Sequence, residues 1–393
     1  MTLYIYLFIG IVFTLMIGGY YKPELFLKRE QRCYNGSIPM FSFSAKTAYF
    51  PIVLLLLVLF LIFAAFRTIN IPDVFGRFGG YDAYIYSLRF DEANLPLMQS
   101  LLHQRNEPGY GLFVWIIRKI TPEYRIFLLV FYTILFILQI KILSRINITG
   151  YTLFSYFSIC FISIVISFCL QRNILAMFIT WLGYVYLNEK KYIKSFLWFA
   201  VASSFHFSAI ICYPVWVIYV LSSKNSFSLK KALIYWIVLF VVIYIISMFA
   251  VQKIMLFIDS GYNKYFMSEL SGLAINTYIG RSYLIILMLW KFKALINHNS
   301  MNKIMFLVLL TSLYVIPLQS VLRIMYRMLL ISDLAVFFVI PEVISAYPPK
   351  RQNYLVSILI RLSLVLYLIY SIISFSTKTF YSYALDNYSN ILF

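Results

Sequence analysis

The chain has 393 residues, of which 62% are hydrophobic and only 12% are charged, and its mean hydropathy is +0.85. This composition excludes an ordinary water-soluble protein, because a soluble fold of this length cannot bury so many apolar side chains. The net charge of +19 could suggest a nucleic-acid partner, but the basic residues stand in short clusters between apolar runs, which is the positive-inside pattern. We therefore predict an all-α polytopic membrane protein without a nucleic-acid partner, with about 10–12 transmembrane helices in one domain over residues 1–393.

Apolar runs that are long enough to cross a bilayer follow one another along the chain. We predict spans near residues 3–21, 48–66, 124–140, 148–168, 174–187, 232–250, 282–296, 304–320, 328–344 and 354–375. Lys-rich segments between them indicate the cytoplasmic side. They occupy residues 22–46, 141–145, 190–194, 224–231, 291–303 and 350–351. The N-terminus, the C-terminal tail and the largest extracytoplasmic loop, residues 67–110, are then expected outside.

One segment, residues 195–221, does not fit a simple count of spans. Both of its flanks are Lys-rich and thus predicted to be cytoplasmic, yet its 27 residues are too few for two full spans. Either one flank is misassigned, or the segment is a re-entrant pair of half-helices that line a cavity. We favour the re-entrant pair, because it keeps every other loop consistent with the charge rule. His206 lies near the middle of this segment.

Arginines mark three places at the predicted outer face. Arg172 joins two apolar runs with almost no loop between them, and Arg323 and Arg327 are one helical turn apart. A guanidinium can bind a phosphate with two parallel hydrogen bonds, so these residues are candidates for holding a diphosphate. The alternative is that they are interfacial anchors whose charges reach the water layer.

Two carboxylates and one imidazole are candidates for acid–base chemistry. Asp82 and Glu107 lie in the largest outer loop and could accept a proton, or they could cap helices or pair with Arg105. His206 could act as a general base in the predicted break, or it could be a hydrogen-bonded structural residue. The chain contains no GxxxxGK[ST], HExxH or Asp-x-Asp motif. We therefore expect no metal and no cofactor.

Four motifs in chain order resemble the EpsG-type and Wzy-type bacterial polysaccharide polymerases. They are Gly80-Tyr81-Asp82 with Tyr84 and Tyr86, Glu107-Pro108-Gly109-Tyr110, Gln171-Arg172-Asn173-Ile174-Leu175-Ala176, and Phe205-His206-Phe207-Ser208-Ala209. Such enzymes resemble C-type glycosyltransferases. They join undecaprenyl-diphosphate-linked repeat units into O-antigen or exopolysaccharide at the outer, periplasmic or extracellular, face of the plasma membrane.

The resemblance and the residue chemistry together assign a role to each candidate. Arg172, Arg323 and Arg327 would bind the donor diphosphate, and His206, Asp82 or Glu107 would activate the acceptor hydroxyl. The glycan would contact Tyr81, Tyr110 and Gln171. Expected partners are the lipid-linked glycan, membrane lipid and a chain-length regulator protein. The alternatives are a flippase or transporter of the same glycolipid, and a ligase or acyltransferase acting on it; a transporter commonly contains two similar halves, which this sequence does not display.

Overall fold

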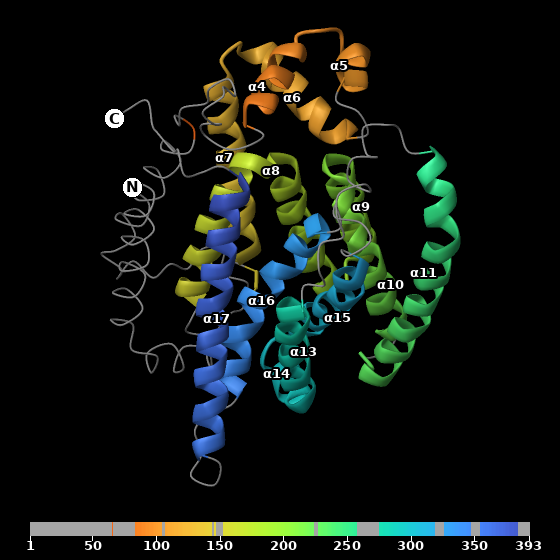
Figure 1. Ribbon diagram of the computed structural model, residues 1–393, viewed down its shortest axis with the longest axis vertical. Coiled ribbons are helices and arrows are strands. Elements are labelled where there is room, and N and C mark those ends of the chain that lie inside the picture. The colour runs from red at the N-terminus through yellow and green to blue at the C-terminus, as the bar shows by residue number, and fades with distance from the viewer. Residues whose placement is uncertain are drawn as a thin grey trace. The chain divides into compact units, whose positions relative to one another are not determined.

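The computed structural model describes residues 65, 83–103, 107–143, 145–146, 152–223, 227–257, 275–318, 326–346 and 354–383. This part of the chain is built of helices and short connections and contains no strand (Figure 1). The predicted all-α class is therefore confirmed for the described residues. The predicted span near 3–21, and that near 48–66 apart from Ala65, lie outside them.

Across the described residues, no helix meets the combined requirements of length and apolar character for a membrane span.

The predicted spans that lie within the described residues coincide with the long helices. These helices are α7 (Tyr124–Leu143), α8 (Thr152–Asn188), α11 (Leu229–Phe257), α13 (Ile275–Trp290), α15 (Asn302–Leu318), α16 (Tyr326–Ala346) and α17 (Tyr354–Tyr383), with the short α14 (Phe292–His298) after α13. The helix α8 covers two predicted runs, and Leu170 divides it with non-helical angles (φ −129°, ψ 47°). The division falls directly before Gln171 and Arg172, where the sequence predicts a break between the two runs.

Helices also occupy the region that we predicted as the largest outer loop. They are α4 (Ala83–Glu92), α5 (Leu97–His103) and α6 (Pro108–Ile120). Pro108 is the first residue of α6. Proline suits this position, since the first helical N–H has no partner within the helix and the ring fixes a helical φ. Glu107 consequently lies at the entrance of a helix.

The chain divides into two compact units, one of residues 1–174 and 369–393 and the other of residues 175–368. Each unit is described by itself, and the prediction of one domain stays a prediction. In the first unit, aromatic rings hold α4, α6 and α7 together. The ring of Phe127 lies 5.3 Å from that of Phe90, 5.6 Å from that of Phe113 and 5.5 Å from that of Tyr124, between centroids. Such tilted and stacked pairs contribute beyond the apolar area that they bury.

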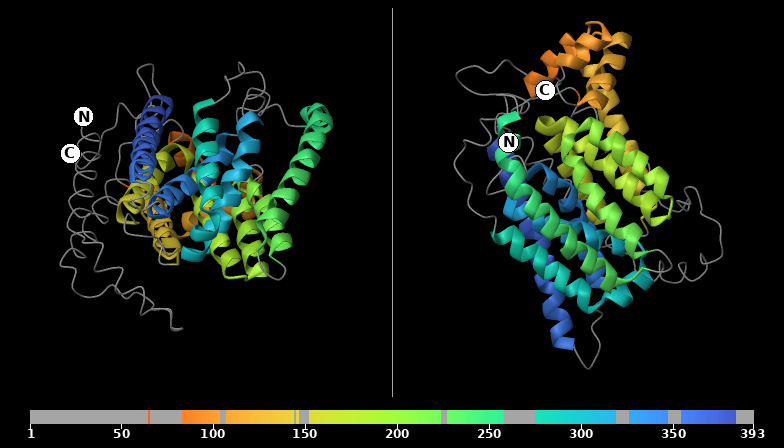
Figure 2. Two further views of the ribbon diagram at one scale, coloured as in Figure 1. Left: turned by 90° about the horizontal axis from the view of Figure 1, so that it is seen from below. Right: turned by 90° about the vertical axis from the view of Figure 1, so that its right-hand side faces the viewer.

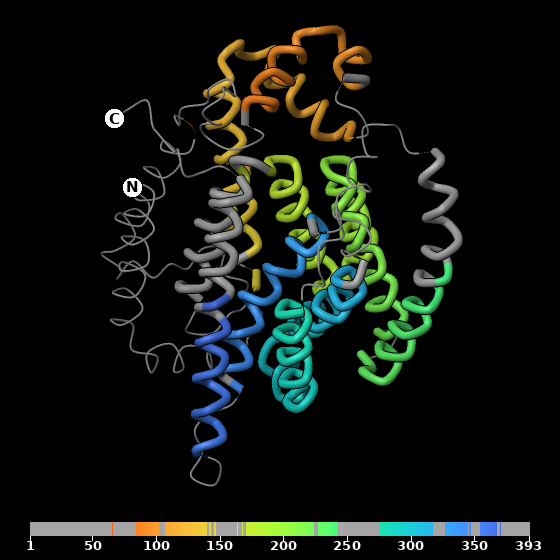
Figure 3. The backbone as a smooth tube through the Cα atoms, viewed as in Figure 1, coloured from red at the N-terminus to blue at the C-terminus, as the bar shows by residue number. Residues whose placement is uncertain are grey.

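In the second unit, α15 is the central helix. It packs against α10, α11, α13, α14 and α16, and every side chain from Ile304 to Leu310 is buried. The second half of α8 is bound to α16 by a hydrogen bond of 3.0 Å from Trp181 Nε1 to the Ile331 carbonyl oxygen. Close packing against the next helix in the chain requires Gly183, since a Cβ there would lie 2.4 Å from Cε1 of Phe199. Figure 3 follows the backbone through these elements.

The predicted pair of half-helices is present as a helical hairpin. It consists of α9 (Tyr192–Phe205), the 3-10 helix η1 (Phe207–Ile211) and α10 (Cys212–Ser222), with the break at His206. The helices run antiparallel, side by side (Figure 2). Trp216 Nε1 donates to the Tyr192 carbonyl oxygen at 3.4 Å, and the rings of Phe196 and Tyr213 are 5.5 Å apart. Both Lys-rich flanks therefore emerge at the same end of the hairpin.

Candidate functional site

An ion pair between Glu107 and Arg172 is the centre of the candidate site in the first unit. Glu107 precedes α6, and Arg172 stands two residues beyond the break in α8. The Glu107 Oε2 atom accepts a hydrogen bond from Nη1 of Arg172. The carboxylate side chain is 7% exposed and the guanidinium side chain 17% exposed, so the pair is largely removed from water. Two motifs that lie 65 residues apart in the sequence thus form one charged group.

Three tyrosines and one glutamine surround this ion pair. The guanidinium carbon of Arg172 lies 5.7 Å from the ring centroid of Tyr86 and 6.0 Å from that of Tyr110, which are cation–π distances. Tyr110 donates to Gln171 Oε1 at 3.0 Å, and Gln171 Nε2 donates to the Tyr124 hydroxyl at 3.0 Å. Because Tyr110 and Gln171 are almost fully buried, their polar groups fix the turn that carries Arg172.

The surroundings of Arg172 and Tyr110 keep the Arg172 guanidinium charged and the Tyr110 phenol neutral. Burial by itself would lower the pKa of Arg172, but Tyr86 and Glu107 raise it, and the net result lies above the ordinary arginine value. Burial raises the pKa of the Tyr110 hydroxyl, so Tyr110 remains a hydrogen-bond donor at neutral pH. Arg172 Nε is buried and has no hydrogen-bond partner among the described residues. The arginine therefore has a donor available beyond the one that Glu107 uses.

His206 belongs to the second unit, where it ends α9 and caps η1. Its backbone is extended (φ −158°, ψ 130°), and the side chain is buried. The Nδ1 atom accepts a hydrogen bond from the backbone N–H of Ser208 at 3.1 Å and lies 2.8 Å from Ser208 Oγ. Since a backbone N–H can only donate, Nδ1 is the unprotonated nitrogen of the neutral ring and Nε2 carries the proton. The imidazole thus has a donor at Nε2, whereas a base needs an unprotonated nitrogen directed at the substrate.

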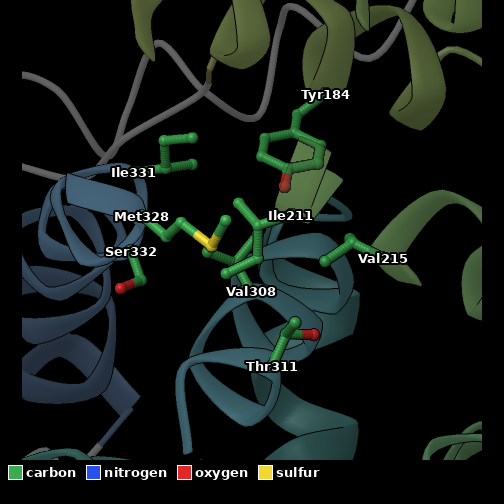
Figure 4. Close-up of a pocket in the computed structure, with 8 residues that line it drawn as sticks. All are labelled: Tyr184, Ile211, Val215, Val308, Thr311, Met328, Ile331 and Ser332. Carbon is green, nitrogen blue, oxygen red and sulfur yellow. The ribbon is translucent and has the colours of Figure 1, made fainter. Parts of the chain in front are cut away.

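Arg327 lies in the first turn of α16, and α16 packs against η1, which follows His206. Between these two elements is a narrow pocket (Figure 4). Its apolar lining residues are Ile211, Val215, Val308, Met328 and Ile331, and its hydroxyl groups come from Tyr184, Thr311 and Ser332. Ile211 follows His206 in η1 and Met328 follows Arg327 in α16, so the segments that carry His206 and Arg327 meet at this pocket. Asp82, Tyr81 and Arg323 lie outside the described residues.

Two polar pairs in the second unit, one buried and one partly buried, were not predicted. Arg281 Nη2 on α13 donates to Oδ1 of Asp333 on α16, and Asn302 Nδ2 donates to Glu342 Oε2 at 3.2 Å. Ionisable residues within predicted spans were the signal that could have found Asp333 and Glu342. In the described part of the chain, no group of three His, Cys, Asp or Glu side chains is placed to hold a metal ion.

Comparison with known protein families gives one match. The sequence model of the EpsG family matches residues 48–385, which is most of the chain. No curated protein and no solved structure matches this chain.

Proposed function

Since this chain belongs to the EpsG family, and the family implies a polysaccharide polymerase, we propose that it joins undecaprenyl-diphosphate-linked repeat units into O-antigen or exopolysaccharide. The reaction is a glycosyl transfer at the outer face of the bacterial plasma membrane. The observation that carries the proposal is the buried Glu107–Arg172 pair with an additional guanidinium donor.

A membrane location is supported by the apolar surfaces of two helices. α11 exposes Ile234, Ile237, Val238, Val241, Val242 and Ile245, and α17 exposes Leu355, Val356, Leu359, Leu362, Val365 and Leu366. Water would not favour such continuous apolar faces, whereas lipid chains would.

The contacts within the second unit are consistent with the predicted sidedness. Asn188 Nδ2 donates to Ser300 Oγ at 2.9 Å, which joins two loops that are both predicted to be cytoplasmic. Arg281 directly precedes the predicted span 282–296 on its outer side, and its partner Asp333 lies in the outward part of the predicted span 328–344.

In the proposed chemistry, arginine side chains bind and stabilise the leaving group. Arg172 binds the donor diphosphate, with Arg323 and Arg327 as further cations for it. A hydroxyl of the acceptor repeat unit attacks the anomeric carbon of the donor glycan, and the bond from that carbon to the diphosphate oxygen breaks. Undecaprenyl diphosphate leaves with the electron pair, and the guanidinium charge stabilises it.

The hydroxyl proton passes to a carboxylate. Glu107 is the described candidate, because it lies beside the arginine that holds the leaving group, and Asp82 is the other. His206 then acts by hydrogen bonding from Nε2 or by shaping the break, since its Nδ1 is occupied by Ser208. Tyr110 and Gln171 contribute by positioning Arg172, and Tyr81 remains a candidate for glycan contact. A chain-length regulator protein remains an expected partner.

The test uses a deletion strain and its own glycolipid. Surface polysaccharide from the strain that lacks the protein is separated on a gel, and the lipid extract is then incubated with purified protein in liposomes. The proposal expects a ladder that collapses to a single repeat unit in the deletion strain and reappears with the wild-type protein, but not with Arg172→Ala. Loss of every surface product together with internal accumulation of the glycolipid would instead identify a flippase. A normal polymer ladder that is no longer attached to its acceptor would identify a ligase.

A further inference from the structure

Asp333 has an accessible side chain in a stretch of α16 that is otherwise buried. In the described stretch from Leu329 to Ile344, every other residue is buried, whereas the Asp333 side chain is 29% exposed. Asp333 lies six residues beyond Arg327, which is about 9 Å along a helix axis. A carboxylate at this depth of a predicted span is costly if it faces lipid. We therefore expect the accessible side of Asp333 to meet water or a polar ligand.

Arg281 on α13 binds this carboxylate from the interior of the second unit. Its Nη2 atom donates to Oδ1 of Asp333, and its side chain is only 1% exposed. Arg281 Nη1 is also buried and has no hydrogen-bond partner among the described residues. A guanidinium in such a place is stable only if it is paired, so the contact with Asp333 is essential to it. The result is a carboxylate that is accessible and a counter-charge that is not.

Further polar groups lie near this pair at the outer end of α13. Thr277, which is half-buried, stands one helical turn before Arg281 and thus on the same face of the helix. A Cβ at Gly280 would lie 2.5 Å from the hydroxyl oxygen of Tyr367 on α17. The missing side chain at Gly280 thus lets the phenol of Tyr367 lie directly against α13. Two hydroxyl groups therefore accompany the carboxylate at this end of α13.

The charges of the pair distinguish between three classes of ligand. The accessible carboxylate of Asp333 would repel an anion such as a diphosphate, and the buried guanidinium of Arg281 is out of its reach. A cation would find the carboxylate already neutralised. A neutral molecule with many hydroxyl groups offers hydrogen-bond donors to the carboxylate and has no charge that needs a partner. The pair therefore favours a sugar over an ion.

From this arrangement we infer that Asp333 binds sugar hydroxyls of the lipid-linked repeat unit, with Arg281 as its positioning residue. Hydroxyl groups of the glycan donate hydrogen bonds to the accessible side of the Asp333 carboxylate. The outward part of the predicted span, where Asp333 lies, is the side on which the glycan is expected. The inference rests on the proposed function for the identity of the glycan, and it adds a glycan contact in the second unit.

The test measures binding of the oligosaccharide repeat unit to the purified full-length protein by saturation-transfer NMR. Mild acid releases this oligosaccharide from the glycolipid of the deletion strain. Asp333→Asn keeps the shape of the side chain and removes its charge, so the Kd should rise about tenfold, since hydrogen bonds to a charged group are lost. Inorganic diphosphate should bind to Asp333→Asn no more weakly than to the wild type.

The double variant Arg281→Met/Asp333→Leu separates binding from folding. Asp333→Asn alone leaves the Arg281 guanidinium without its counter-charge, whereas apolar replacement of both partners of a buried pair is often neutral or stabilising. The double variant should therefore unfold at the same or a higher temperature than the wild type and still bind the oligosaccharide at least about tenfold more weakly.

Glu342→Gln is the matched control, because Glu342 is a second carboxylate of α16 that is completely buried and accepts a hydrogen bond from Asn302. This variant should bind the oligosaccharide like the wild type. No binding by the wild type, equal affinity of the wild type and the double variant, or an equal loss in Glu342→Gln would each overturn the inference. Weaker binding of inorganic diphosphate to Asp333→Asn would overturn the choice of a sugar as the ligand.

The inference and the proposed function can fail separately. Oligosaccharide binding that depends on Asp333, without polymer formation in liposomes, would refute the polymerase and leave the glycan site standing. Polymer formation by the wild type, together with unchanged oligosaccharide binding in the double variant, would refute the glycan site and leave the polymerase standing.

Discussion

The ion pair of Glu107 and Arg172 can be tested by a double-mutant cycle on stability. Removing one partner of a fully buried pair costs about 3–5 kcal/mol, whereas an exposed pair is worth about 0–1 kcal/mol. With side chains that are 7% and 17% exposed, Glu107→Gln should lower the free energy of unfolding by about 2–3 kcal/mol. The Glu107→Gln substitution leaves the partly buried guanidinium of Arg172 without its counter-charge. Arg172→Gln should cost a similar amount.

The double variant decides whether the two effects belong to one contact. If they do, Glu107→Gln/Arg172→Gln should cost less than the sum of the single variants, with a coupling of about 1.5–2.5 kcal/mol from denaturant unfolding. Arg118 and Asp91 provide the control pair in the same unit, since their atoms are 4.0 Å apart and Asp91 is 66% exposed. Its coupling should stay below about 0.5 kcal/mol. A Glu107–Arg172 coupling no greater than that of the control would refute the reasoning.

Three further changes have defined outcomes. Gly183→Ala places a Cβ against Phe199 and should destabilise the protein by about 1–3 kcal/mol in denaturant unfolding, and an unchanged midpoint would show that the ring moves aside. His206→Gln retains a side-chain acceptor for the capping role and should keep part of the polymer length on a gel that His206→Ala loses; equal loss in both would return the imidazole to the role of base. Arg172→Lys should not restore the polymer lost in Arg172→Ala, because a point charge cannot replace a bidentate donor, and a full-length ladder from the lysine variant would make this residue a topological anchor.

The helices were predictable because long apolar runs leave few alternatives, and the break at His206 followed from a length that did not fit its flanks. The helices of residues 83–120 were not found, because their apolar positions are interspersed with polar ones and Pro108-Gly109 is typical of a turn as well as of a helix start. The sequence also identified Glu107 and Arg172 as separate candidates. Their contact could not be derived, since it depends on how α6 packs beside the broken end of α8. Tyr124 was missed for the same reason, because only the fold brings its hydroxyl to Gln171.

The two breaks explain why these polar groups stand where they do. A continuous α-helix satisfies its own backbone groups, so interrupting it costs hydrogen bonds unless side chains replace them. At His206, the imidazole replaces such a bond by accepting the Ser208 backbone N–H. After Leu170, the Gln171 amide links two tyrosine hydroxyls, and Arg172 is bound to Glu107. Each break therefore brings its own polar residues into the interior. Packing alone does not require buried polar residues at a helix break. We infer that the two breaks are places where the protein is less stable than a continuous helix would be because function requires these residues there.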